Sequence, residues 1–393
     1  MGTDIAGYDR YRYHLDDAGD KLPKQRQSQM SRPTFTPDHD PRDSKVDQVQ
    51  RFAGWSIGIS SILGEQILSH PCIVLRRQCQ VHFNAESSHL TPFTLFMVIY
   101  NLHRHQTGFI LWKGIGSVFV VRGISMVSET VFSEFTPFPK EISRHSSLKK
   151  LGEHVVLKCL AFIVTTPFYV ASLIETVQSD IASERPGVLD CVKEGITRVI
   201  GWNTPQTTRL LPIWKLILPT VAFRLAHYMI TSVSQYTVTS TIRVEQQESR
   251  GQAAVEGVDN RSKSVYDIYF PELLATFTGG LLADVMLFPA ETVLHRLYLQ
   301  GTRTIIDNTD TGLGVIPINT NYEGVLDCFK SIIMEEGLGG LYKGFGALVL
   351  QYAVHASLLK AAKYLFQKIS ERNGSTIPDN YSDRLVSSNS GLG

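Results

Sequence analysis

The sequence lacks an excess of either basic or acidic residues. Its 38 Lys and Arg and 37 Asp and Glu leave a formal net charge of +1 over 393 residues. Domains that bind nucleic acid usually carry a marked basic excess on one face. The composition therefore gives no support for a nucleic-acid partner.

Cysteine is scarce, and the motifs of common enzymes are missing. Five cysteines stand at positions 72, 79, 159, 191 and 328, with no CxxC pair and no Cys/His spacing suited to zinc. The sequence also has no Walker loop, no HExxH and no GxSxG. We interpret residues 103–105 (His-Arg-His) as a loop cluster without a metal. The expectation is a protein that is not an enzyme, binds no cofactor and keeps idle thiols in a reducing compartment.

The first 50 residues have few large aliphatic side chains and are rich in Asp, Arg, Gln and Pro. Such a segment cannot bury enough apolar area to offset its chain entropy, so residues 1–50 are expected to form a disordered tail. They lack the apolar core of a secretory signal, and five aspartates spoil the acid-poor pattern of a transit peptide. Any targeting signal is therefore expected further along the chain.

Six long segments are apolar and nearly free of charge. Each has about 20 residues or more, which is enough to cross ~30 Å of hydrocarbon. The alternative, a soluble bundle, fits poorly because soluble helices average about 11–12 residues and show a clear polar face. We therefore predict an all-α membrane protein with six transmembrane helices. The segments are 54–79, 113–135, 153–178, 209–238, 271–299 and 344–368.

Polar residues recur inside these segments. In a bilayer such residues usually face a bundle interior or a wet cavity. They could line a cavity or only make polar contacts between packed helices, and the sequence leaves both open. Basic residues occur in loops on both sides, so the orientation stays undecided. The candidate cavity residues are Arg122, Glu129, Arg224, His227 and His355.

Three prolines mark a repeat, since each lies near the C-terminal end of an odd-numbered segment. A proline inside a helix removes one backbone hydrogen bond and kinks the axis, so kinks are expected at Pro71, Pro167 and Pro289. The prolines are 96 and 122 residues apart. A polar linker at 240–266 accounts for the excess, because loops tolerate insertions.

A second motif follows the first and third prolines. An aromatic residue, a lysine and a glycine end 43 residues after Pro71 and 55 residues after Pro289. The extra 12 residues fit within the Thr- and Asn-rich stretch 300–321. The motif residues are Trp112, Lys113 and Gly114 in the first copy, and Glu336, Gly337, Tyr342, Lys343 and Gly344 in the third; the second keeps only Glu194 and Gly195.

This pattern resembles the repeat signature of the mitochondrial carrier family. That signature has a kinking proline, an acid two residues on, bases five and seven on, and the Glu-Gly and aromatic-basic-Gly motifs further along. The strings PCIVLRRQCQV and PFYVASLIETVQS are similar to a divergent outer-membrane branch of the family. The resemblance implies three pseudo-symmetric repeats at 51–150, 151–239 and 267–372, followed by a disordered tail at 373–393.

In the family, the acid of one copy pairs with the base of the next, and three such pairs close one end of the cavity. Here the first copy has Ile73 for the acid but keeps Arg76. The second copy keeps no charge, and the third keeps Glu291 and, at the second basic place, Arg296. The resemblance therefore implies one surviving inter-repeat bridge, between Arg76 and Glu291. The alternative is that Arg76 reaches lipid head groups.

Two pairs of small residues allow close helix contact, namely Gly54 with Gly58 and Ala275 with Gly279. In the family they lie between odd and even helices of one bundle. Contact between two copies of the chain, a homo-oligomer, is the alternative.

The resemblance implies a multi-pass adaptor of the mitochondrial outer membrane that is not an active transporter. Its implied roles are in mitochondrial fusion and fission, cristae organisation and lipid exchange with the endoplasmic reticulum. Implied partners are membrane lipids, fusion GTPases of the mitofusin type, the MICOS complex and endoplasmic reticulum membrane proteins. The alternative is an inner-membrane carrier that exchanges a small metabolite.

Overall fold

The computed structural model describes residues 64, 66–105, 109–140, 147–179, 187, 189–201, 210–255, 265–302 and 304–374. The chain divides into two compact units, Met1–Leu68 and Ser69–Gly393. In the first unit, the described residues are helical. Everything that follows concerns the second unit.

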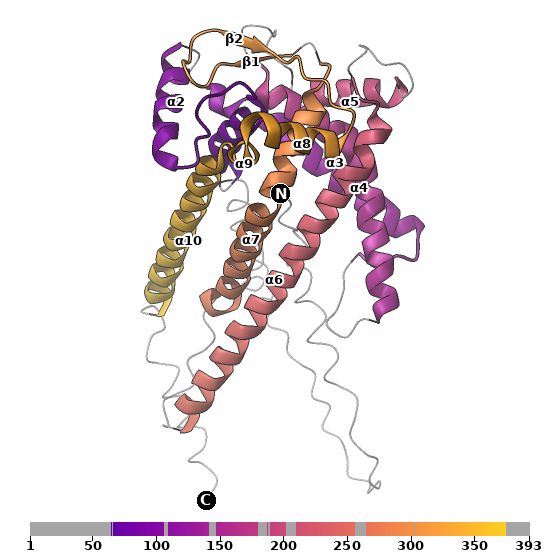
Figure 1. Cartoon of the computed structure of the whole chain (residues 1–393). Coiled ribbons are helices and arrows are strands. Elements are labelled where there is room, and N and C mark those ends of the chain that lie inside the picture. Colours follow the sequence, from indigo (N-terminus) through magenta and orange to yellow (C-terminus); the bar gives the residue numbers. More distant parts are fainter. Residues whose placement is uncertain are drawn as a thin grey trace, which may run out of the picture. The chain divides into compact units, whose positions relative to one another are not determined.

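The second unit is mostly helical. It begins with helical residues 69–81. Within it, short helices and a small hairpin lie at one end of the long helices (Figure 1). In chain order the further elements are α2 (Pro92–His105), η3 (Ile110–Trp112), α3 (Ile115–Phe135), α4 (Leu148–Val177), α5 (Asp190–Ile200), α6 (Ile213–Val255), α7 (Val265–Leu299), β1 (Ile305–Asp307), β2 (Val315–Pro317), α8 (Val325–Glu336), α9 (Leu338–Leu341) and α10 (Phe345–Gly374).

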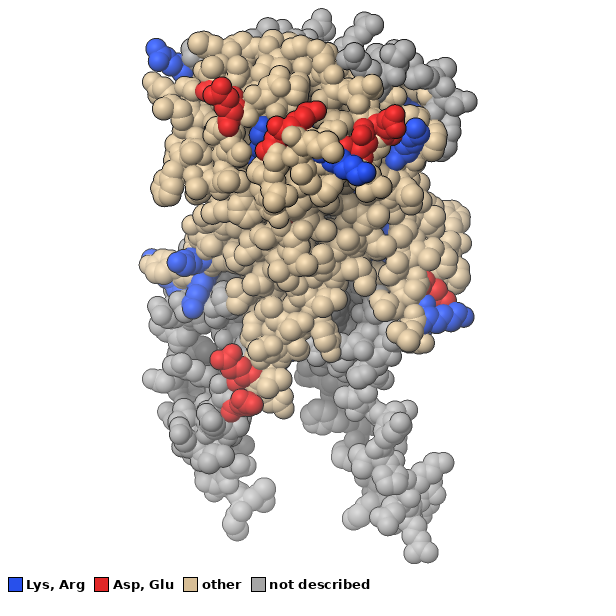
Figure 2. Space-filling model, in the orientation of Figure 1, with Lys and Arg blue, Asp and Glu red and all other residues tan. Residues whose placement is uncertain are grey.

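Four helical stretches among the described residues are long and apolar enough to cross a membrane. They run over Ile110–Phe135, Leu148–Val177, Ile213–Glu245 and Leu273–Leu299. On the face shown in Figure 2, the described charged side chains gather at two levels, and the band between them carries almost none. These features support a membrane protein, whereas six spans and three repeats stay predictions.

Several helix ends differ from the sequence-based expectations. The helix expected over 209–238 continues as α6 to Val255, so much of the expected linker at 240–266 is helical. Its Glu, Gln and Ala residues favour helix without needing burial. Residues 103–105, expected in a loop, lie in the last turn of α2.

The three marker prolines lie within helix. Pro167 is inside α4 and Pro289 inside α7, while Pro71 belongs to the helical residues 69–81. Two further prolines, Pro219 in α6 and Pro271 in α7, were not singled out from the sequence.

Helices α6 and α7 pack closely, and Gly279 lies at their contact. A Cβ atom added to Gly279 would lie 2.9 Å from the backbone oxygen of Thr231 on α6. Ala275, one turn earlier, is buried. Small residues here let two backbones approach each other. Gly54 and Gly58 lie outside the described residues.

The largest apolar core lies among α4, α6, α7 and α8. Its members include Val170, Leu173, Leu294, Leu297 and Tyr298, and Ile306 of the hairpin belongs to the same cluster. The core therefore joins the predicted second and third copies at the end of the molecule where the hairpin lies.

Candidate functional site

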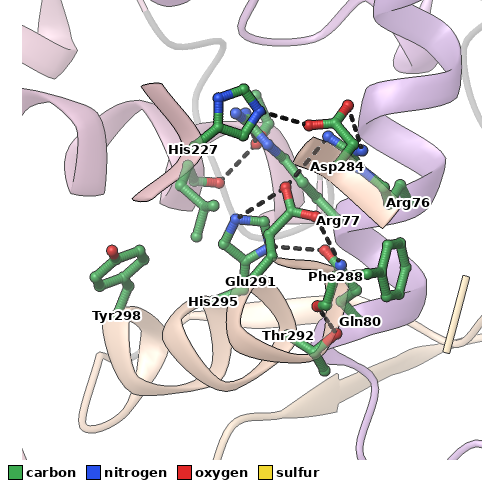
Figure 3. Close-up of polar contacts among 12 residues, drawn as sticks. Arg76, Arg77, Gln80, His227, Asp284, Phe288, Glu291, Thr292, His295 and Tyr298 are labelled. Atoms are coloured by element: carbon green, nitrogen blue, oxygen red, sulfur yellow. Dashed lines mark hydrogen bonds and ion pairs between the residues drawn. The ribbon is translucent and has the colours of Figure 1, made fainter. Parts of the chain in front are cut away.

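Arg76 lies at the centre of a buried network. Its Nη2 atom lies 3.2 Å from Oε1 of Glu291, and its Nη1 atom lies 3.7 Å from Oδ2 of Asp284. Asp284 and Glu291 are two helical turns apart on α7, so both face the segment 69–81 (Figure 3). The side chain of Arg76 is 3% exposed, which excludes contact with lipid head groups.

Asp284 also receives donors from two other helices. The Nε2 atom of His227 on α6 lies 2.9 Å from its Oδ1 atom, and the hydroxyl of Tyr352 on α10 donates to Oδ2 at 2.8 Å. The network thus joins the segment 69–81 to α6, α7 and α10. A carboxylate with three partners is held in one orientation, and it holds its neighbours in turn.

Glu291 has a second set of contacts below Arg76 (Figure 3). The Nε2 amide of Gln80 donates to Oε2 of Glu291 at 3.2 Å. The Nδ1 atom of His295 donates to Oε1 of Gln80 at 2.7 Å. Two side chains of the segment 69–81, Arg76 and Gln80, therefore reach the same carboxylate.

The energetic role of this site follows from its burial. Removing one partner of a buried ion pair strands the other charge and costs about 3–5 kcal/mol, while the intact pair adds little net stability. The network therefore penalises separation of the segment 69–81 from α7. It contains no nucleophile with an activating base, so it holds helices together and offers no evident chemistry for catalysis.

A second ionic cluster lies closer to the hairpin end. Arg296 forms a two-pronged contact with Glu336, in which Nη2 lies 3.0 Å from Oε2. Its Nε atom donates to the backbone oxygen of Gln80 at 2.9 Å. Lys343 lies 2.6 Å from Oε2 of the same carboxylate. Burial opposes ionisation of Glu336, but the hydrogen bonds and charges of Arg296 and Lys343 outweigh it and hold its pKa below the usual range.

The two motif lysines occupy matching places. Lys343 donates to the backbone oxygen of His82, at 3.3 Å, and Lys113 donates to that of Gln178, at 2.7 Å. His82 lies 11 residues after Pro71, and Gln178 lies 11 residues after Pro167. The lysine of the first copy therefore caps the odd helix of the second, and the lysine of the third copy caps that of the first.

The two motif glycines match as well. Both have a left-handed backbone, with φ of 71° at Gly114 and 81° at Gly344. An added Cβ would lie 2.6 Å from a side-chain atom of Thr176 at Gly114, and 2.7 Å from Cβ of Cys79 at Gly344. Only glycine meets both the conformational and the steric demand.

The remaining motif residues have structural places. Gly337 ends α8 with a φ of 73°. The ring of Tyr342 stacks on Phe288, with centroids 6.0 Å apart. Trp112 ends η3 and is partly exposed.

The places of the two lost ion pairs are largely apolar. Between the second and third copies, the acid and base positions hold Tyr169 and Leu294. Leu294 is buried in the main core, and Tyr169 packs against that core with its ring edge-on to Tyr298. Between the first and second copies, the positions hold Ile73 and Ser172, and both are buried.

The candidate cavity residues are dispersed, and four of them contact a neighbouring helix. Glu129 pairs with Lys158 at 2.9 Å. The Nη1 atom of Arg224 lies 2.6 Å from the hydroxyl of Thr165, His227 contacts Asp284, and His355 contacts Ser69. Arg122, the fifth, is partly buried on α3. These contacts fit the helix-packing alternative.

Sequence reasoning did not select three members of these clusters. They are Asp284, Gln80 and Lys158. Asp284 is visible as an acid in an apolar segment, and its spacing of seven residues from Glu291 places both on one helix face. That spacing was the available signal.

Comparison with known proteins supports the same family. Residues 268–373 match the mitochondrial carrier protein family. A Gallus gallus protein named mitochondrial outer membrane protein SLC25A46 is 50% identical over 324 residues, covering 82% of this chain and 78% of the relative. The Homo sapiens protein of that name is 50% identical over 327 residues, covering 83% and 77%. The Danio rerio protein is 50% identical over 323 residues, covering 82% and 80%. The chain therefore belongs to the mitochondrial carrier family, in the branch of the outer-membrane proteins named SLC25A46.

Proposed function

We propose that the chain is an adaptor that uses a carrier body as a static platform in the mitochondrial outer membrane. The body would consist of six transmembrane helices in three repeats. Its roles would be to regulate mitochondrial fusion and fission, cristae organisation and lipid exchange with the endoplasmic reticulum. The outer-membrane location follows the names of the relatives, which cover about four fifths of the chain.

One observation carries the static platform. A carrier alternates between two closed forms, which requires contacts that can be made and broken. Of the three expected ion-pair positions, one holds Arg76 with Glu291, and another is packed into the apolar core at Tyr169 and Leu294. An apolar contact of this kind cannot exchange partners as a surface ion pair does, so it favours one arrangement.

Three repeats are supported by the matched capping contacts. Lys113 and Lys343 reach carbonyl groups at the same distance after the proline of another copy. The even-numbered helix of one copy follows the motif that caps the odd helix of another. This is the relation that a cyclic arrangement of three copies requires.

The proposed partners are fusion GTPases of the mitofusin type, the MICOS complex and endoplasmic reticulum membrane proteins. Their docking segments are proposed to be 1–50 and 240–266, since polar segments can fold on a partner. Deletion of 1–50 should reduce co-purification of the fusion GTPases from mitochondria. Unchanged co-purification would argue against the tail as the docking segment.

Reconstitution into liposomes separates the platform from an inner-membrane carrier. The wild-type chain should give no saturable uptake of metabolite anions above protein-free liposomes. Saturable uptake that Glu291→Ala abolishes would contradict the proposal. Glu134→Ala, which changes an exposed acid on α3, is the matched control.

A further inference from the structure

The hairpin at 304–318 contains the strands β1 and β2 and lies within the stretch that is 12 residues longer than its counterpart in the first copy. The strands are antiparallel, with Ile306 opposite Ile316. Ile306 is fully buried and Thr309 is almost so. An insertion that only lengthened a surface loop would not bury these side chains.

The base of the hairpin is fastened to its own copy. The side-chain amide of Gln300, just after α7, donates to the backbone oxygen of Tyr322 at 2.8 Å. Its Oε1 atom accepts from the backbone nitrogen of Tyr322 at 2.9 Å. The two ends of the insertion are thereby held together beneath the hairpin.

The first strand bonds to the end of α4, in the predicted second copy. The backbone nitrogen of Ser179 donates to the oxygen of Ile305 at 2.8 Å, and Gln178 forms an isolated bridge with Ile306. Gln178 is also the residue that Lys113 caps. Copies one, two and three therefore meet at this point.

The turn of the hairpin bonds to the predicted first copy. The hydroxyl of Thr309 lies 2.9 Å from Nδ1 of His82, and the backbone nitrogen of Glu86 donates to Oδ2 of Asp310 at 3.1 Å. Gly312 packs on Asn101 of α2, where an added Cβ would lie 2.5 Å from its Cβ. Burial lowers the pKa of His82, so its ring is neutral at pH 7 and can accept from Thr309.

We propose that the 304–318 hairpin is a clasp that holds the ends of the three copies together and keeps this end of the bundle closed. The proposal deepens the proposed function, because it rests on the static body and supplies a restraint where two ion pairs are missing. Opening this end separates the odd helices from one another. With the hairpin bonded to the ends of two odd helices and rooted on the third, that separation breaks contacts on both sides.

The native cysteines report on such an opening. Cys79 is buried between the segment 69–81 and the turn at Gly344, which belong to different copies. Cys191 is buried on α5, away from the hairpin contacts given above. A membrane-permeant maleimide, quantified by mass spectrometry at each cysteine in proteoliposomes, measures the open fraction at each place.

The double variant Thr309→Val with Asp310→Ala should label Cys79 about tenfold faster than wild type, because two clasp hydrogen bonds are lost. Cys191 should label at the wild-type rate. Thr311→Val is the matched control, since the Thr311 hydroxyl bonds only to Leu313 within the turn. An unchanged Cys79 rate, or an equal rise at both cysteines, would overturn the clasp.

Hydrogen exchange of the wild-type chain gives a second readout that does not depend on the variant folding. The amides of Ser179 and Glu86 should exchange at the rate of the hairpin's own amides, since release of the clasp exposes all of them. Faster exchange at either one would refute the clasp. Saturable uptake by wild-type liposomes would instead contradict the static platform and leave the labelling result intact.

Discussion

At the scale of single residues, Arg76 has more partners than the sequence indicates. The sequence and the family geometry pair it with Glu291, and that contact is present at 3.2 Å. Asp284 could not be assigned to it, because helix spacing gives the face of α7 but not the depth at which the segment 69–81 crosses it. The site is therefore one cation held by two carboxylates.

This arrangement sharpens the charge-swap experiment. Arg76→Glu or Glu291→Arg alone should destabilise the protein by about 3–5 kcal/mol, since each leaves buried charge without a partner. The double swap should restore only part of this loss, because Asp284 would then face a like charge at position 76. Thermal unfolding in detergent measures all three.

The same experiment has a control in α3. Glu134→Arg reverses an exposed charge and should change stability by no more than about 0.5 kcal/mol. A double swap as unstable as the sum of its single changes would show that Arg76 and Glu291 do not act as a pair.

Glu336 predicts how stability depends on acid. Its pKa in the folded protein lies below the usual 4.5, so the unfolded chain binds the proton more tightly. The stability that it contributes is present above pH 4.5 and is lost as the pH falls through the lower, folded value. Between about pH 5 and 3, wild type should lose stability more steeply than Glu336→Gln.

Equal pH profiles for wild type and Glu336→Gln would contradict this account. The burial of His82 and His89 adds a separate effect, since each has a lowered pKa in the folded protein. The stability that depends on their neutral rings is lost as the pH falls below about 6.5. The Glu336 comparison is therefore made below pH 5, where both rings are protonated in the unfolded chain.

At the scale of helices and strands, the sequence predicts position better than extent. Apolar length places the segment that became α6, but its end was expected at 238 and lies at Val255. Hydropathy reports where a helix leaves the apolar layer, whereas the helix itself continues through Glu and Gln residues that favour it. At about 1.5 Å per residue, its 43 residues span about 65 Å, roughly twice the hydrocarbon thickness.

The hairpin was also missed as structure. Residues 300–321 are rich in Thr, Asn and Gly and were interpreted as a loop insertion. Strands β1 and β2 have three residues each, too few for an alternating pattern to stand out. Their stability comes from contacts with distant segments at His82 and Ser179, which sequence spacing does not reveal.

Close packing of α6 on α7 gives a prediction at this scale. Gly279→Ala should destabilise the protein by about 1–3 kcal/mol, because the new Cβ meets the backbone of α6 at 2.9 Å and neither backbone yields easily. Gly123→Ala on α3 has open space around it and should be neutral or stabilising by about 0.5–1 kcal/mol. Denaturant unfolding in detergent compares the two, and equal effects would refute the packing argument.

At the scale of the whole molecule, the chain is a carrier-family protein with uneven repeats. Four candidate spans are present among the described residues, and the matched contacts of Lys113 and Lys343 support a cyclic arrangement. The family could be predicted because prolines and turn motifs are local in sequence. The static character could not, because it depends on what fills the places of the lost charges.

The most direct test of the static body is a distance measurement across one end of it in liposomes. Spin labels at Asn84 and Lys193 are exposed and lie on the predicted first and second copies. Pulsed dipolar spectroscopy in a background without native cysteines should give one narrow distance distribution, unchanged by a mixture of metabolite anions. Two populations whose ratio shifts with the anions would show an alternating carrier and contradict the account.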